Sequence, residues 1–212
     1  MTNSNPYLDD FTQMYEPALK ALRSPWRNYE LGVDDRYTLT PEDAYKLRTT
    51  NTFHLRDLLV RKYSWAVPNE KALECIRTLA TRPIIEWGAG SGYWASLLAQ
   101  RGVEITCYDK KPWDTLYHPV TECSDPTKVD WRGKALMLVW PPYEEPMASE
   151  VLREYLRANA RRTIIYVGEG YGGCTGDDIF HEQLKITFGG PDEVITLPTY
   201  EGIHDSLVIY KS

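Results

Sequence analysis

A glycine-rich segment followed by an acidic residue is the part of the sequence best suited to chemistry. The run at 84–94, IIEWGAGSGYW, places Gly88, Gly90 and Gly92 between an apolar stretch and a helical pattern. Glycines let a backbone approach a ligand closely and adopt positive φ, and the start of a helix offers unpaired N–H groups. About 20 residues later Asp109 ends the next apolar run, where a carboxylate can accept both hydroxyls of a ribose. The spacing therefore predicts a site for a nucleoside-containing ligand.

The spacing of the glycines separates two classes of cofactor. Dinucleotide-binding loops follow G-x-G-x-x-G, whereas this loop reads G-x-G-x-G and has Tyr93 in place of the glycine that packs helix against strand. Glu86, just before the loop, would repel a diphosphate, and it suits a cofactor that carries a cationic amino group. Both features favour S-adenosylmethionine over a dinucleotide.

The pattern E-x-G-x-G-x-G after a strand, with Asp109 closing the next strand, resembles motifs I and II of the class I S-adenosylmethionine-dependent methyltransferases. The resemblance covers about residues 83–212. It implies that Glu86 and the backbone of 88–92 face the methionine part of the cofactor, that Asp109 holds the ribose and that Lys110 flanks the adenine. The alternative is an α/β fold in which the glycines only form a tight turn.

The adenine amine and the methionine end have further candidates. Many members of the family bind the amine through an acid after the third strand, and Asp125 is preferred here over Asp130. The segment before motif I often crosses the cofactor cleft in the family, which makes Tyr63, Ser64 and Trp65 candidates for covering the methionine end. Trp65 and Trp94 can equally be core anchors. The residues expected around the cofactor are Tyr63, Trp65, Glu86, Gly88, Ala89, Gly90, Gly92, Tyr93, Trp94, Asp109, Lys110, Asp125 and Trp140.

The turn WPPY at 140–143 ends a buried apolar run, and its two prolines fix a rigid extended conformation. It resembles the (D/N/S)PP(Y/F) motif of methyltransferases that act on exocyclic amines of adenine, cytosine or glutamine. Trp140 replaces the polar first residue, and its indole can donate a hydrogen bond but cannot accept a proton. Within the turn, only the backbone carbonyl of Trp140 or Pro141 is then left to accept a hydrogen bond. Tyr143 is expected either to stack on a planar acceptor or merely to pack.

Two further residues at strand ends are candidates for work on the methyl acceptor. Glu169 lies in a second glycine cluster, VGEGYGGCTGDD (167–178), and could orient or deprotonate the acceptor while its neighbours form a lid or a pocket wall. The alternative is that Thr175 or Asp177 caps the next helix. His204, next to an aspartate, could be a general base or a structural residue. The catalytic candidates are Trp140, Tyr143, Glu169 and His204.

The elements that must position these residues alternate between strand and helix. Apolar runs predict strands, helical periodicity separates them, and the stretch 110–133 is weakly patterned. This alternation predicts a Rossmann-like α/β fold: an open, doubly wound, mostly parallel sheet with a C-terminal antiparallel strand. Residues 1–80 are expected to form an N-terminal helical cap or extension, and 81–212 the S-adenosylmethionine-binding catalytic domain. The predicted strands are 83–90, 103–109, 134–142, 162–170, 192–198 and 204–212, and the predicted helices are 11–24 (broken near Pro17), 39–49, 52–65, 69–82 (capped by Asn69), 92–102, 148–160 and 178–188.

Composition limits the partners. The 212 residues include 24 Lys+Arg and 30 Asp+Glu, a net charge of -6, which provides no broad basic face for duplex nucleic acid. No apolar run approaches the length that spans a bilayer, so a cytoplasmic protein is expected. The four cysteines form no CxxC pair, which favours free thiols and no metal.

The predicted function is therefore methyl transfer from S-adenosylmethionine to a nitrogen or oxygen of a small molecule or of a peptide or protein residue. Three alternatives remain at this stage: an exocyclic-amine methyltransferase acting on nucleic acid, an enzyme that uses the same cofactor for other chemistry, and a binding protein of this fold without activity. The sequence does not specify the oligomeric state.

Overall fold

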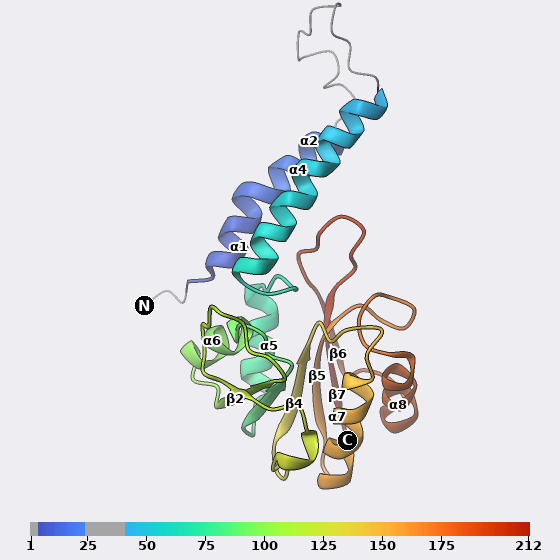
Figure 1. The fold of residues 1–212 in the computed structure, drawn as a ribbon. Coiled ribbons are helices and arrows are strands. Elements are labelled where there is room, and N and C mark those ends of the chain that lie inside the picture. The colour runs from blue at the N-terminus through green and yellow to red at the C-terminus, as the bar shows by residue number, and fades with distance from the viewer. Residues whose placement is uncertain (1–3, 24–40) are drawn as a thin grey trace, which may run out of the picture.

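A computed structural model describes residues 4–23 and 41–212, and a seven-stranded sheet forms the centre of this part of the chain (Figure 1). The strand order is β3-β2-β1-β4-β5-β7-β6. Strands β1 to β5 pair in parallel, whereas β7 runs antiparallel to both of its neighbours. The strands are β1 (Ile84–Trp87), β2 (Ile105–Asp109), β3 (Val120–Glu122), β4 (Ala135–Val139), β5 (Thr163–Gly168), β6 (Glu193–Thr196) and β7 (Ser206–Lys211).

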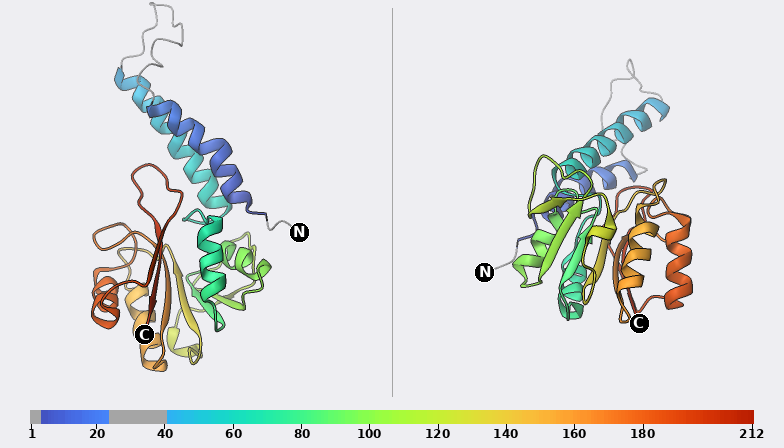
Figure 2. Two further views of the ribbon diagram at one scale, coloured as in Figure 1. Left: turned by 180° about the vertical axis from the view of Figure 1, so that it is seen from behind. Right: turned by 60° about the horizontal axis from the view of Figure 1, so that its bottom comes forward.

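Helices cover both faces of the sheet. Helices α5 (Glu70–Leu79) and α6 (Tyr93–Gln100) lie on one face, and α7 (Met147–Ala158) and α8 (Asp178–Phe188) lie on the other (Figure 2). Neighbouring residues of β1 point to opposite faces, so Ile84 joins one buried cluster and Ile85 joins the other. The prediction of an open, doubly wound, mostly parallel sheet with an antiparallel C-terminal strand is confirmed.

The N-terminal helices form an arm that rises from the carboxyl edge of the sheet (Figure 1). Helix α1 (Pro6–Asp10), a π-helical segment η1 (Phe11–Tyr15) and α2 (Glu16–Arg23) follow one another without interruption, and they pack against α4 (Pro41–Lys62). The break predicted near Pro17 is wrong. Proline lacks an N–H, and here it lies in the first turn of α2, directly after the π-helical turn, where the chain can continue as a helix.

Two predicted helices, 39–49 and 52–65, are joined in the single helix α4, and the predicted residues 39 and 40 lie outside the described residues. Helix α5 begins after Asn69 as expected, because the Asn69 side chain accepts a hydrogen bond from the N–H of Ala72 at 2.8 Å. Helix α5 contacts α6, so it belongs to the helical layer of the sheet. The division of the chain at residue 80 stays a prediction.

An aromatic cluster fixes the base of the arm to the sheet. Tyr7 is fully buried and stacks on Tyr63 with ring centroids 4.8 Å apart. Its hydroxyl lies 2.8 Å from that of Tyr200, in the loop after β6, and its N–H donates to the Tyr93 hydroxyl at 3.0 Å. Tyr93 opens α6, so the base of the arm lies directly against the glycine loop and the first turn of α6.

Replacing Asp177 by alanine is expected to lower the free energy of unfolding by about 1–3 kcal/mol, because two helix starts lose an acceptor. One carboxylate oxygen accepts the Phe180 N–H in α8 at 3.0 Å, and the other accepts the Ser149 N–H in α7 at 3.1 Å. Urea denaturation of the variant measures the loss. The neighbouring variant Asp178→Ala is the control, and an equal loss there would contradict a specific capping role.

Among the described residues no helix is both long enough and apolar enough to cross a bilayer. All four cysteines are free, and within the described parts of the chain no group of three or more His, Cys, Asp or Glu side chains could hold a metal ion.

Candidate functional site

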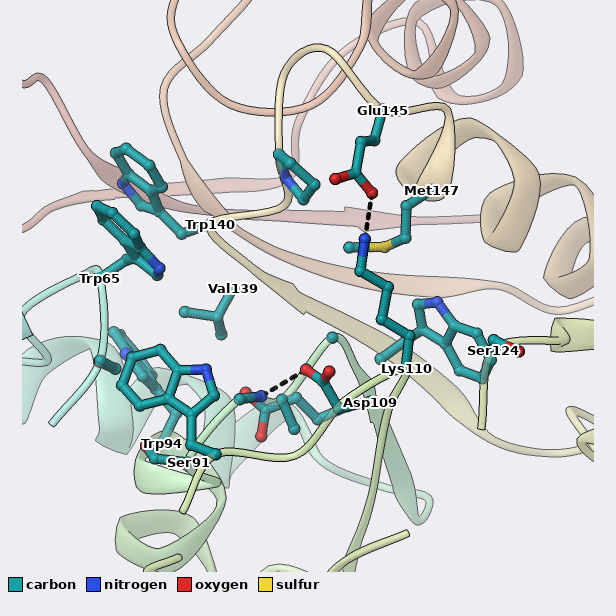
Figure 3. A pocket seen from close by; sticks show the side chains of 18 of the residues that line it. Trp65, Ser91, Trp94, Asp109, Lys110, Ser124, Val139, Trp140, Glu145 and Met147 are labelled. Carbon is teal, nitrogen blue, oxygen red and sulfur yellow. Dashed lines mark hydrogen bonds and ion pairs between the residues drawn. The ribbon is translucent and has the colours of Figure 1, made fainter. Parts of the chain in front are cut away.

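A cavity of about 420 Å³ opens at the carboxyl edge of the sheet, where the strand order passes from β1 to β4 (Figure 3). The ends of β1, β2 and β4, the start of α7 and the segment between α4 and α5 line it. In open α/β sheets ligands bind at such a reversal of strand order, because the connections on either side lead away from each other. The volume lies in the range of small-molecule sites.

The glycine loop forms one wall of this cavity, and its conformation requires glycine. Gly90 has a φ of +54°, and a Cβ atom built on it would lie 3.0 Å from the Trp113 ring. At Gly88 a Cβ would lie 2.9 Å from the Met147 methyl group. The loop is held from below, since the N–H groups of Gly88 and Ala89 both donate to the carbonyl of Tyr108 in β2. The backbone can therefore approach a ligand closely.

Asp109 ties the end of β2 to this loop. One carboxylate oxygen accepts the Gly90 N–H at 2.8 Å, and the other accepts the Lys111 N–H at 2.8 Å (Figure 3). Each oxygen of a carboxylate has a second lone pair, so both can still accept a ligand hydroxyl. The loop bonds fix the direction of the carboxylate before any ligand arrives.

Glu86 belongs to β1, lines the cavity and is only 1% exposed. Burial raises the pKa of this carboxyl group to about 8, and the nearby charge of Asp109 adds to the rise, although a weak hydrogen bond from the Cys107 thiol at 3.6 Å opposes it. A cation beside Glu86 would favour the charged form. The cavity therefore offers a buried carboxylate that lacks a cationic partner among the described residues.

An ion pair joins two sides of the cavity mouth. The Lys110 ammonium lies 2.6 Å from the Glu145 carboxylate, and both side chains are more than half exposed (Figure 3). Ser124, Pro126 and Met147 line the same part of the cavity. Exposed pairs of this kind contribute little to stability, so the pair can open for a ligand.

Asp125 does not line the cavity. Its carboxylate accepts hydrogen bonds from the N–H and the hydroxyl of Thr127, at 3.0 and 2.6 Å, and so caps the 3₁₀ turn η3 (Pro126–Lys128). The other candidate, Asp130, pairs with Arg132 on the surface at 2.8 Å. In the structure Ser124, rather than either acid, reaches the cavity.

Two stacked indoles form a further wall. The rings of Trp65 and Trp140 are 4.7 Å apart and nearly parallel, and both line the cavity (Figure 3). The Trp140 indole N–H donates to both carboxylate oxygens of Asp205, at 2.9 and 3.1 Å. The Pro141 carbonyl accepts the N–H of Gly176 at 2.9 Å. The WPPY turn was expected to offer the indole N–H and the Pro141 carbonyl to the methyl acceptor. Both groups already have hydrogen-bond partners within the protein.

Hydrogen bonds within the protein hold the second glycine cluster in place. The Glu169 carboxylate accepts the N–H groups of Cys174 and His204, each at 2.7 Å, and the Tyr166 hydroxyl donates to the Glu169 carbonyl. Burial alone would raise the pKa of Glu169, but these hydrogen bonds outweigh it and hold the pKa below its usual value. His204 Nδ1 lies 3.4 Å from the same carboxylate, while its ring is 86% exposed. Asp177 caps α8, which agrees with the simpler of the two sequence interpretations.

Comparison with known proteins adds the following findings. No family model matches the sequence, and no curated protein matches it. A similar solved structure is magnesium protoporphyrin IX methyltransferase from Synechocystis PCC 6803 with bound S-adenosylmethionine (12% identity, TM-score 0.49, 99% of this chain and 100% of that chain). Others are a Burkholderia thailandensis 1,6-didemethyltoxoflavin-N1-methyltransferase (16% identity, TM-score 0.45, 85% and 93%) and a Lactobacillus delbrueckii subsp. bulgaricus ribosomal protein L11 methylase (13% identity, TM-score 0.42, 69% and 81%).

The order of the strands decides the fold. Strand β7 is inserted antiparallel between β5 and β6, and all other described pairs from β3 to β5 are parallel. The fold is that of the class I methyltransferases. The resemblance seen in the sequence is confirmed at this level.

Within this methyltransferase fold the cavity brings together ten of the residues named from the sequence and leaves out six. The lining includes Trp65, Glu86, Gly88, Ala89, Gly90, Tyr93, Trp94, Asp109, Lys110 and Trp140. The residues outside it are Tyr63, Gly92, Asp125, Tyr143, Glu169 and His204. Tyr63 is packed in the aromatic cluster, and its hydroxyl donates to Asp10 at 2.6 Å. Gly92 precedes α6 as its N-cap, and Tyr143 is 44% exposed.

Among the residues that line this cavity, sequence reasoning missed Trp113 and Met147, whereas Ser64, named beside Trp65 in the segment before the glycine loop, does line it. Trp113 covers the glycine loop from the weakly patterned stretch after β2, and Met147 reaches the loop from the first turn of α7. The available signal was an aromatic residue shortly after the acid that ends β2. This signal indicates a cavity residue only when the β2–β3 connection is known to lie over the end of β1.

Proposed function

We propose that the protein is an S-adenosylmethionine-dependent methyltransferase that transfers a methyl group to a nitrogen or oxygen of a small molecule or of a peptide or protein residue. The observation that carries the proposal is the single cavity in which Glu86, the glycine loop and Asp109 meet. Glu86 suits the ammonium group of the cofactor, the glycine loop lets the ligand approach closely, and Asp109 suits the ribose hydroxyls. The three features follow one another in that order along the edge of the sheet.

The residues of the cavity fit this cofactor in chemical type. The buried Glu86 carboxylate would pair with the ammonium group, and Asp109 would accept the ribose hydroxyls. Lys110, Ser124 and Met147 would surround the adenine. When bound, the cofactor supplies a methyl group already activated by the positive sulfur, so the protein has mainly to align the acceptor and exclude water.

The acceptor side of the cavity is the Trp65–Trp140 wall. Trp140 is proposed to offer its ring surface, because its N–H group is held by Asp205. Tyr143, Glu169 and His204 lie outside the cavity lining, so they are proposed to meet only an acceptor that extends beyond it. Glu144 and Glu145 directly follow the WPPY turn, and this negative charge favours a small molecule or peptide over a nucleic acid. A cytoplasmic location belongs to the same proposal, since free thiols suit a reducing compartment.

Calorimetry with three ligands tests the proposal. We expect S-adenosylmethionine and S-adenosylhomocysteine to bind at one site per chain and NAD not to bind, because Tyr93 occupies the position of the third dinucleotide glycine. Binding of NAD in place of the S-adenosyl ligands would overturn it. Mass spectrometry then tests turnover, since methyl transfer releases S-adenosylhomocysteine, whereas other chemistry on the same cofactor releases different products.

A further inference from the structure

Trp140 has a backbone conformation that needs support. Its φ is +54°, and among the described residues no other residue except glycine has a positive φ. A bulky side chain in the left-handed region is strained and persists only where the surrounding structure holds it. The backbone on both sides is fixed, because the Trp140 N–H donates to the Val167 carbonyl at 2.7 Å and the Pro141 carbonyl accepts the Gly176 N–H.

The indole N–H of Trp140 is held by one residue. Asp205 lies directly before β7 and is 2% exposed, and its two carboxylate oxygens receive the same indole N–H. Among the described residues no other side chain donates a hydrogen bond to this carboxylate. A hydrogen bond to a charged, buried acceptor is among the stronger ones in proteins, and loss of the donor would leave that acceptor unsatisfied.

Charged groups of both signs act on Asp205. Burial, with a smaller contribution from the neighbouring Glu169 charge, raises the pKa of its carboxyl group to about 7, although the Trp140 N–H, Arg56 of α4 and His204 oppose the rise. Arg56 in the arm and Glu169 at the end of β5 thus both lie close enough to shift the pKa of Asp205. Three separate parts of the chain therefore meet at the residue that holds the indole.

The held indole has a defined position at the cavity. Its ring lies 4.7 Å from that of Trp65, with an angle of 8° between the planes, and Trp65 is still 42% exposed. Asp205 accepts a hydrogen bond from the nitrogen edge of the Trp140 ring, and Trp65 covers one face of that ring. Val139 and Pro142, which lie beside Trp140 in the chain, also line the cavity. A ring fixed on an edge and a face presents one surface to a ligand.

We infer that Asp205 is a positioning residue: its carboxylate holds the indole of Trp140, whose backbone is strained, so that the Trp65–Trp140 pair forms a rigid wall on the acceptor side of the cavity. The role of this wall rests on the proposed function, but the contact itself does not. Asp205 acts through Trp140, and within the described residues it does not line the cavity itself. Its loss should therefore disturb the wall without removing a cofactor contact.

Nuclear magnetic resonance of the tryptophan indole N–H groups in the full-length protein tests the inference. In wild type we expect a Trp140 signal, assigned through Trp140→Phe, that exchanges slowly with water. Asp205→Ala should accelerate this exchange by about tenfold to 100-fold, because one strong hydrogen bond is lost. Asp205→Asn keeps one acceptor oxygen and should restore most of the protection. Trp94 and Trp131 donate to backbone carbonyls elsewhere, so their signals report whether the fold is intact.

Two results would overturn the inference. One is fast exchange of the Trp140 indole in wild type. The other is unchanged exchange in Asp205→Ala or faster exchange in Asp205→Asn than in Asp205→Ala, with the Trp94 and Trp131 signals intact. If Asp205→Ala does not fold, the comparison of Asp205→Asn with wild type decides, since loss of one of two contacts should still accelerate exchange severalfold.

Titration with S-adenosylhomocysteine separates this inference from the proposed function. In wild type the Trp65 and Trp140 signals should shift as the ligand saturates the site. In Asp205→Ala the dissociation constant should change less than about threefold, well below the tenfold step that 1.4 kcal/mol represents, while the shift of the Trp140 signal is lost. No binding to wild type would contradict the proposed function alone. A large loss of binding in Asp205→Ala would contradict a role confined to Trp140.

Discussion

Replacing Glu86 by glutamine is expected to weaken binding of S-adenosylhomocysteine about 100-fold or more, because the ammonium group of the proposed ligand loses the buried carboxylate with which it pairs. Glutamine has nearly the same size and can fill the same space, so the loss reports charge. Calorimetry at pH 8, where a substantial fraction of the carboxyl groups is ionised even before the ligand binds, measures it.

Two matched controls make the result specific. Glu150→Gln carries the same chemical change at an exposed position of the cavity lining, and it should alter affinity by less than about threefold. The ligand 5′-methylthioadenosine has the nucleoside and the sulfur but no amino acid, and its affinity should be the same for wild type and Glu86→Gln. If Glu86→Gln weakens both ligands equally, Glu86 does not pair with the ammonium group.

The same substitution should change how stability depends on pH. Folding raises the pKa of Glu86 from 4.5 to about 8, so between these values the folded chain keeps a proton that the unfolded chain has lost. Stability in the absence of ligand must then fall as the pH rises from about 4.5 to about 8, and glutamine removes this contribution. We expect urea denaturation to show the variant gaining stability relative to wild type at pH 8 but not at pH 4.5. Equal differences at both pH values would contradict the raised pKa.

The parts of the site that the sequence predicted are those in which function follows from local spacing. Glu86 and the three glycines lie within seven consecutive residues, and Asp109 is placed by one helix and one strand of ordinary length. The parallel pairing of β1 with β2 then brings Asp109 to the loop without any further choice of topology. Helix α8 was predicted at its observed bounds because Asp177 caps its start and Gly189 follows its end.

The parts that the sequence could not predict depend on contacts between distant segments. Strand β3 is only three residues long and lies at the edge of the sheet, so it has neither a long apolar run nor a buried pattern. Asp205 was seen only as the neighbour of His204, because its contact with Trp140 joins residues 65 positions apart. Asp125 was preferred as the acid after the third strand of the family, and in the structure it also caps its own Asp–Pro–Thr turn, so its contact with the adenine stays a prediction.

Replacing Asp109 by alanine is expected to weaken binding of S-adenosylhomocysteine by about 100-fold or more, because the variant loses acceptors for two ribose hydroxyls and also the bonds that fix the loop. Asp109→Asn keeps one acceptor oxygen and should lose about tenfold. These two effects, recognition of the ribose and support of the loop, must be separated, since either alone would weaken binding.

A ligand change makes that separation. An S-adenosylhomocysteine analogue without the 2′-hydroxyl should bind wild type about tenfold more weakly, while Asp109→Ala should bind the analogue and the parent ligand equally, because the acceptor for that hydroxyl is already gone. A purely supporting role for Asp109 predicts instead that removal of the hydroxyl costs the same affinity in both proteins. Equal binding of analogue and parent ligand by wild type would show that the carboxylate at the end of β2 does not recognise a ribose, and the proposed orientation of the cofactor would then be wrong.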